Sequence, residues 1–484
     1  MCTMKRSDCT CSLSAMSEWE SPDHEPTLPV SEKSNPLTHN IDQASAACIV
    51  RMLQACDAQM FQAETGETYQ GGAHSEGVLP LDPLDKLVVL SGCGTSGRLA
   101  FLMSSFNREL KKLNQSLVYS YIIVSEGKKQ VLFIGISCGL SAPFVAGQLD
   151  FCLQHPEVYT PVMVGFNPTH QAKDEPVPGC TFTFRSLVHK MQELAKSQKA
   201  FLINPTVGPE AISGSSRMKG GSATKILLDI VLSTAHSATF NRTPITYNST
   251  VHCFSLRHGR RVCYLGWGSL AVLGLIDASE CNPTFGAGER SGNYFSLTKD
   301  LAVCCLQGPQ FSIGHEDFLH LVLPHVSDQD TVLLLYTHSD NVSEVLKLAC
   351  QVREKTSNLH AVYHGTDGDT TAEQSKAKEK RSIPSLSQQW ELSTKLVLNA
   401  ISTGAHILKG KVYQNHMIDV QVTNSKLYCR ATRLLQVYRI IPCVCLQVVP
   451  LALVCLLTAC SLSDAESHLE KQPIIREAVM TWLS

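Results

Sequence analysis

The chain carries almost no net charge. Its 41 Lys and Arg residues nearly balance 43 Asp and Glu residues, which gives a formal charge of -2 at pH 7 and a pI near 6.8. A protein that tracks nucleic acid or lies on an anionic membrane needs an excess of positive charge on its binding face. We therefore expect neither nucleic acid nor a membrane among its partners.

Paired metal-ligand spacings are also missing. The 20 cysteines stand alone or in apolar runs, and Cys9 and Cys11 have no second Cys or His pair nearby. A structural zinc site takes four such ligands. We expect no metal and no cofactor. Because no signal peptide precedes the cysteines, we expect them to be reduced thiols inside the cell.

One stretch without charge, Ile440–Leu462, is long enough to cross a bilayer. It contains Pro442 and Pro450, and a capping-box pattern follows it at residues 463–466. A buried helix after a loop is the favoured interpretation, and a transmembrane helix is the alternative.

A glycine-rich turn is the first positive signal. The turn Gly92–Arg98 follows the apolar run Leu87–Leu90 and precedes a helix-like run at 99–103. It lacks the later acidic residue of a dinucleotide fingerprint and the Gly-Lys-Ser/Thr of a Walker loop. The pattern predicts a helix N-terminus that binds an anion, and an ordinary strand-to-helix turn is the alternative.

A second turn of the same kind ends the strand-like run Val131–Ile136. Adjacent parallel strands bring their carboxyl ends to one crevice. We therefore expect the hydroxyls of Thr95, Ser96, Ser137 and Ser141 to surround one phosphate. The alternative is that the serines only cap helices.

The chain is partly a duplication. Residues 264–269 repeat the pattern of 89–95, and residues 395–406 repeat 225–236. Further strand-like runs at 161–166, 200–203, 331–336 and 359–363 predict an α/β protein with parallel sheets. The second unit has Ser269-Leu-Ala271 in its first turn and Asp340 in its second, so we expect one phosphate site, in the first unit.

Several segments resemble the sugar isomerase (SIS) family of phosphosugar-binding domains, and within it the vertebrate regulators of glucokinase. The segments that carry the resemblance are residues 31–38, 94–98, 135–147, 208–225, 402–406 and 414–417. Among them, Gly214-Ser-Ser-Arg-Met-Lys219 is also similar to bacterial N-acetylmuramic acid 6-phosphate etherases, which are enzymes.

The resemblance implies two tandem SIS domains, each a flavodoxin-like parallel sheet flanked by helices, with an N-terminal helix and a C-terminal helical lid. The expected divisions are a disordered tail at 1–40, a helical segment at 41–80, the SIS domains at 81–250 and 251–406, and the lid at 407–484. The helical segment has apolar residues at helical spacing, including Cys48, Ile49, Met52, Leu53, Cys56 and Met60.

The resemblance also implies a regulator that is not an enzyme, that inhibits glucokinase in the cytoplasm and nucleus, and that binds fructose 6-phosphate and fructose 1-phosphate. Matched by motif, the ligand-binding residues are Thr95, Ser96, Ser137, Cys138, Gly139, Ser141 and Lys411. Arg217 is expected near the pocket. Lys411 has an alternative role, offsetting the dipole at a helix C-terminus.

An etherase-like or isomerase-like enzyme is the competing function. In the etherases an acidic motif follows the phosphate loop at once, but here Phe106 stands at the acid position and the motif lies at Asp277–Thr284 in the second unit. Phosphate loop and general acid are then expected to be apart, unless Glu280 crosses between the units.

Two departures from the family predict a weakened response. Only Ser125–Gln130 separates two strand-like runs where the family has a helix with a sugar-binding glutamate, and Glu126 cannot be given that role. Residues 366–385 contain no aromatic residue where the family has a hydrophobic-aromatic stretch that grips glucokinase. The favoured interpretation of these residues is a solvated loop.

Overall fold

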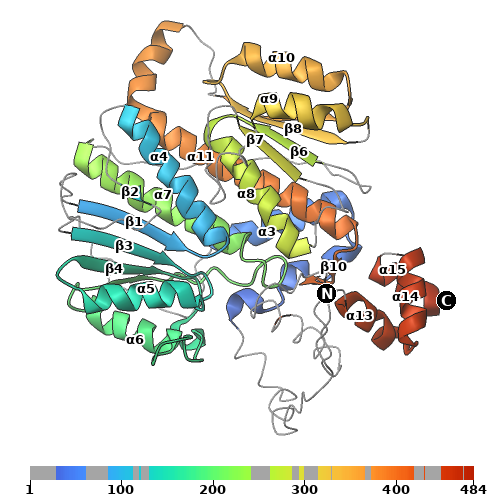
Figure 1. Ribbon diagram of the computed structural model, residues 1–484, viewed down its shortest axis with the longest axis horizontal. Coiled ribbons are helices and arrows are strands. Elements are labelled where there is room, and N and C mark those ends of the chain that lie inside the picture. The colour runs from blue at the N-terminus through green and yellow to red at the C-terminus, as the bar shows by residue number, and fades with distance from the viewer. Residues whose placement is uncertain are drawn as a thin grey trace.

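Two α/β units in series and a small helical cluster make up this computed structural model (Figure 1). The structure describes residues 29–61, 86–112, 119–120, 130–240, 262–285, 294–298, 314–328, 330–365, 372–418, 430, 448–472 and 474–483. Each unit is a parallel sheet with helices on both faces. The α/β prediction is confirmed.

The first unit contains a five-stranded parallel sheet in the order β2-β1-β3-β4-β5. Its strands are β1 (Lys86–Gly92), β2 (Tyr119–Ser120), β3 (Gln130–Ile136), β4 (Tyr159–Val164) and β5 (Phe201–Ile203). Its helices are α4 (Thr95–Lys112), α5 (Pro143–Gln154), α6 (Phe184–Ala195) and α7 (Lys219–Phe240). The strands are continuous apolar runs because helices cover both faces of the sheet.

The second unit repeats this order as β7-β6-β8-β9, again all parallel. Its strands are β6 (Val262–Gly266), β7 (Tyr294–Thr298), β8 (Thr331–Thr337) and β9 (Leu359–His364). Its helices are α8 (Gly268–Phe285), α9 (His315–Asp317, continued irregularly to His325), α10 (Val342–Arg353) and α11 (Ala372–Leu408). Matching strand orders in the two sheets agree with the duplication.

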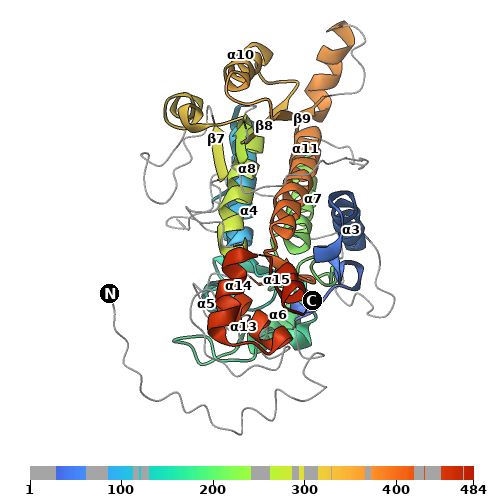
Figure 2. The same cartoon turned by 90° about the vertical axis from the view of Figure 1, so that its right-hand side faces the viewer.

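Helices α4, α7, α8 and α11 form a shared layer between the two sheets (Figure 2). Leu99 and Leu102 of α4, from the first unit, pack in one cluster with Tyr264 of β6, from the second. The two units therefore share part of their hydrophobic core, and residues of one unit lie beside loops of the other.

The N-terminal segment is docked rather than free over residues 30–40, which corrects the expected tail of residues 1–40; residues 1–28 lie outside the described part. It forms short 3-10 turns at Val30–Glu32, Pro36–Thr38 and Ile41–Gln43. Asn35 and Thr38 are fully buried, and Thr38 Oγ1 donates to the carbonyl of Ala211 at 2.7 Å. Polar side chains that bond backbone carbonyls of the first unit hold this segment in place.

Helix α3 (Ala46–Ala58) follows, with Ile49, Leu53 and Cys56 buried as the helical spacing predicted. Cys48, expected on the same face, is exposed, and Met60 lies in the 3-10 turn Gln59–Phe61 after the helix. The described residues after α11 include a hairpin and three helices. They are β10 (Val412–Tyr413), β11 (His416–Met417), α13 (Val448–Thr458), α14 (Leu462–Lys471) and α15 (Ile475–Leu483). The predicted buried helix is present as α13, with Leu453 and Val454 in a core. Within the described residues, no helix has the length and apolar character that a membrane crossing requires.

Residues 372–385 are helical and belong to α11, so the expected solvated loop over 366–385 is wrong for them. Helix α11 runs for 37 residues. The short crossover at 125–130 falls almost wholly in residues 121–129, outside the described part.

Candidate functional site

The first loop, at residues 92–96, is a tight turn that connects β1 to α4. A Cβ atom at Gly92 would lie 2.7 Å from the Cβ of Ser96, so only glycine fits there. Gly94 takes a positive φ of 57°, and the Arg98 amide donates to its carbonyl at 3.0 Å to begin the helix. The first turn of a helix has N–H groups with no partner inside the helix, which suits an anion.

The second loop turns from β3 into α5. Ser137 Oγ accepts hydrogen bonds from the amides of Ser141 at 3.1 Å and Ala142 at 3.2 Å. Ser137 therefore fixes the loop that precedes α5, but it does not cap this helix, whose N-cap is Ala142 and has no side-chain hydrogen bond. A hydroxyl that accepts two N–H groups still has its own proton to donate to an anion.

The two loops meet, as the strand ends predicted. Ser96 Oγ lies 3.5 Å from Cys138 Sγ, which also lies 3.7 Å from Thr224 Oγ1 of α7. Asn167, at the end of β4, donates from Nδ2 to the Cys138 carbonyl at 3.2 Å. Asn167 was missed at the sequence level, although it follows a third strand end of the same sheet.

Gly139 and Ser141 lie beside this contact. A Cβ atom at Gly139 would lie 3.4 Å from Ser141 Oγ and 3.6 Å from Asn167 Nδ2. The predicted residues of the second loop thus gather at one place against the first loop.

Glu280 of α8 crosses between the units and reaches the first loop. Its carboxylate lies close enough to the Thr95 side chain for Thr95 to lower its pKa, and its Oε1 lies 3.7 Å from Arg98 Nη1. The expectation that acid and phosphate loop lie apart is therefore wrong, because α4 and α8 pack together in the shared layer. Burial raises the pKa of Glu280, and the positive charges of Lys395 and Arg217 oppose that rise.

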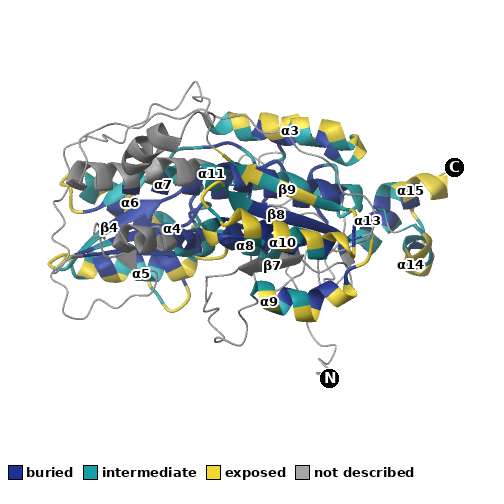
Figure 3. Ribbon diagram, turned by 90° about the horizontal axis from the view of Figure 1, so that it is seen from above, coloured by how far each residue is buried: buried dark blue, intermediate teal, exposed yellow. Residues whose placement is uncertain are grey.

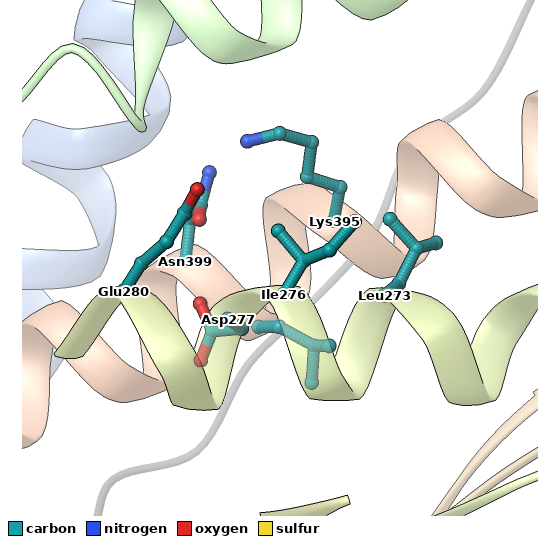
Figure 4. Close-up of a pocket in the computed structure, with 7 residues that line it drawn as sticks. Leu273, Ile276, Asp277, Glu280, Lys395 and Asn399 are labelled. Carbon is teal, nitrogen blue, oxygen red and sulfur yellow. The ribbon is translucent and has the colours of Figure 1, made fainter. Parts of the chain in front are cut away.

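A small cavity between α8 and α11 lies beside the Glu280 side chain. It is lined by Leu273, Ile276, Asp277, Glu280, Lys395, Leu398 and Asn399, and it has room for about one water molecule. Figure 4 shows the charged ends of Glu280 and Lys395 extending to the same side of this cavity. Glu280 Oε1 is buried and accepts no hydrogen bond of ordinary length from the described residues. It is therefore able to accept one from a ligand.

Lys395 brings a buried positive charge close to the first loop. Its Nζ donates to the carbonyl of Arg217 at 2.7 Å, and a Cβ atom at Gly221 would lie 3.3 Å from Nζ and 3.1 Å from Thr95 Cγ2. Burial lowers the pKa of Lys395. This residue was also missed at the sequence level, where it was noted only as part of the repeat.

The guanidinium of Arg217 donates hydrogen bonds to residues of the second unit. It donates to Asp277 Oδ1 at 3.0 Å and to Thr403 Oγ1 at 2.6 Å, and it lies over the Phe285 ring. Tyr264 also donates to Asp277, at 3.0 Å. Arg217 therefore joins the two units through a buried network.

Lys411 lies just beyond the end of α11, where its amide donates to the His406 carbonyl at 3.0 Å. That position agrees with the alternative of a lysine near a helix C-terminus, and its role above a sugar phosphate stays a prediction. Among the described residues, no group of three or more Cys, His, Asp or Glu side chains is arranged to bind a metal.

Comparison with known proteins identifies the family. The N-terminal SIS domain of glucokinase regulatory protein matches residues 76–125 and 123–153, its second SIS domain matches 245–409, and its C-terminal lid domain matches 414–442 and 445–479. The glucokinase regulatory protein of Xenopus laevis is 41% identical, covering 87% of this chain and 82% of its own length. This chain belongs to the glucokinase regulatory protein family.

The human glucokinase regulatory protein is 38% identical over 96% of this chain and 94% of its own length. The N-acetylmuramic acid 6-phosphate etherase of Bacillus cytotoxicus is 34% identical, but over only 37% of this chain and 63% of its own length. The relatives that match throughout are named as regulators, whereas the catalytic relatives match one part. The predicted arrangement of tandem SIS domains with a lid is confirmed by these matches and by the parallel sheets.

Proposed function

We propose that this member of the glucokinase regulatory protein family binds and inhibits glucokinase, and that fructose 6-phosphate and fructose 1-phosphate modulate the inhibition. The observation that carries this proposal is the match to named regulators over most of both chains. The cytoplasm and nucleus are the proposed locations.

The meeting of the two loops supports phosphosugar binding. In the proposed complex, the phosphate lies against the first turns of α4 and α5 and accepts hydrogen bonds from Thr95, Ser96, Ser137 and Ser141. The positive ends of two helix dipoles and the backbone N–H groups favour the anion there. Glu280 accepts a hydrogen bond from a sugar hydroxyl and replaces the family's glutamate, which the short crossover lacks.

A ligand bound in this way contacts both units, because the loops belong to the first and Glu280 to the second. It therefore stabilises one relative arrangement of the units over others. A ligand that binds two arrangements with different affinities transmits a signal between sites. This is the proposed link from sugar phosphate to glucokinase inhibition.

The test is inhibition of glucokinase titrated with the full chain, without and with saturating fructose 6-phosphate. We expect inhibition, and a small shift of its inhibition constant by the ligand, because residues 125–130 are too few for the crossover helix that the family resemblance implies. Absence of inhibition at any concentration of the chain contradicts the proposed function. A large ligand-dependent shift contradicts the expected weak coupling.

A further inference from the structure

Two cysteines lie on either side of the turn that joins α13 to α14. Cys455 is in the last turn of α13, and Cys460 lies between the end of α13 and Ser461, the N-cap of α14. Both thiols are free and half-buried. The turn belongs to the cluster of α13, α14 and α15 at one end of the molecule, where α14 and α15 carry exposed residues (Figure 3).

The backbone of this turn brings Cys460 back toward Cys455. Ala459, the first residue after α13, has a positive φ of 56°. When a helix ends on a left-handed residue at C′, the chain turns back, and the side chain at C″ commonly contacts the one at C3 in the last helical turn. With Ala459 at C′, Cys460 is C″ and Cys455 is C3. The two thiols therefore occupy the positions that meet at this kind of helix end.

Hydrogen bonds on both sides of Cys460 hold the turn. Its amide donates to Thr458 Oγ1 at 3.4 Å, and the Thr458 hydroxyl donates to the Val454 carbonyl at 2.7 Å. On the other side, Ser461 Oγ accepts from the Asp464 amide at 3.2 Å and caps α14. Two helix ends therefore determine where Cys460 lies.

The side chains of the two cysteines lie close together. Both pack against the hydrophobic cluster that contains Leu453 and Val454. Burial raises the pKa of the Cys455 thiol, and the Cys460 side chain lies close enough to add to that rise. A raised pKa keeps a cysteine in its thiol form, which is less reactive than the thiolate. This environment favours a reduced pair in the absence of an oxidant.

We propose that Cys455 and Cys460 form a reversible oxidation site, at which a peroxide converts the two thiols into a disulfide. One sulfur, as its thiolate, attacks an oxygen of hydrogen peroxide, the O–O bond breaks, and the products are a sulfenic acid and, after protonation of the leaving hydroxide, water. The other sulfur attacks the sulfenic sulfur, so that the S–S bond forms, the S–O bond breaks and a second water leaves. The two sulfurs are oxidised, the peroxide is reduced, and a thiol reductant reverses the change.

The disulfide joins the last turn of α13 to the residue before the N-cap of α14. It closes a ring over residues 455–460 and opposes unwinding of α13 at its end. None of the residues assigned to phosphate binding belongs to α13, α14 or α15. The oxidation site is therefore independent of the proposed sugar-phosphate site.

The experiment treats the folded full chain with hydrogen peroxide, alkylates the remaining thiols in denaturant and maps disulfides by mass spectrometry. Trypsin releases residues 440–471 as one peptide, because no Lys or Arg lies within 440–470. Further cleavage after leucine separates Cys455 both from Cys460 and from Cys445, since leucines lie in both intervals. Fragments that stay joined identify the bridged pair.

Three variants accompany the unmodified chain. Cys455→Ser and Cys460→Ser each remove one sulfur of the pair. The matched control is Cys180→Ser, which removes another half-buried thiol, in the first unit. Because the decisive map is made on the unmodified chain, a variant that does not fold leaves the test valid.

We expect peroxide to join Cys455 to Cys460 in most molecules, and dithiothreitol to restore both thiols. The bridge should be absent from Cys455→Ser and Cys460→Ser and present in Cys180→Ser. Recovery of both cysteines as alkylated thiols after peroxide overturns the proposal. A bridge from either one to another cysteine, such as Cys443 or Cys445, or oxidation to sulfinic acid without a bridge, overturns it as well.

Discussion

The loops at the carboxyl ends of the two sheets differ in charge. In the first unit, the loops after β1 and β3 carry hydroxyls and backbone amides but no acidic side chain. In the second unit, Asp340 Oδ2 accepts from the Thr337 amide at 2.7 Å and from its hydroxyl at 2.9 Å. The loop after β8 in the second unit therefore already carries a carboxylate. Two sheets of the same strand order therefore carry loops of different charge, and the proposed phosphate site is assigned to the loops without an acidic side chain.

The paired helices α7 and α11 differ in a similar way at equivalent lysines. Lys225 is fully buried and lies 2.7 Å from carboxylates of both Asp229 and Glu391. Its counterpart Lys395 donates to a backbone carbonyl, and among the described residues no carboxylate lies within 4 Å of its Nζ. The first lysine joins α7 to α11 by charge, whereas the second faces the candidate site.

The largest expected effect separates these two lysines. Lys225→Met leaves two carboxylates without their partner in a buried place, and we expect the protein to lose roughly 3–5 kcal/mol of stability. Lys395→Met removes one hydrogen bond to a carbonyl, and we expect a loss of about 1–3 kcal/mol. Urea unfolding of both variants measures the difference. Equal losses would show that the two lysines have the same structural role.

The next test uses the glycines that end the first strand of each unit. A Cβ atom at Gly266 would lie 2.5 Å from Ala271 Cα, and one at Gly92 would lie 2.9 Å from the Ser96 carbonyl carbon. We expect Gly266→Ala and Gly92→Ala each to cost roughly 1–3 kcal/mol, since backbone atoms must move. Only Gly92→Ala should remove the rise in melting temperature caused by fructose 6-phosphate. If Gly266→Ala removes it too, the site is not confined to the first unit's loops.

The smallest effect on the fold is expected from serine substitutions in the loops. Ser96→Ala with Ser137→Ala should abolish stabilisation by fructose 6-phosphate, which for a ligand at 100 times its Kd is about 2.7 kcal/mol. Ser269→Ala with Ser339→Ala, two serines from the corresponding loops of the second unit, should leave it intact. Thermal melting with and without ligand measures both. A retained ligand response in the first double variant would exclude these hydroxyls from the site.

The strands and the two loops were predictable because their signals are local. A buried parallel strand is a continuous apolar run, and the small residues after β1 and β3 mark the turns directly. Glu280 was placed wrongly because its approach to Thr95 depends on the packing of α4 on α8, which no local pattern records. Residues 30–40 appeared to be a tail because their polar side chains are satisfied by distant backbone groups, such as the Ala211 carbonyl.

The docked N-terminal segment has a consequence for synthesis. Asp42 is paired at 2.7 Å with Arg476, 434 residues later, and Asn35 accepts a hydrogen bond from Asn415, 380 residues later. Contacts between residues so far apart form late, because the intervening chain must first be made and brought together. Residues 35–38 can bond the Pro209 and Ala211 carbonyls once the first unit has been made, but the contacts with Asn415 and Arg476 form only after those residues have left the ribosome.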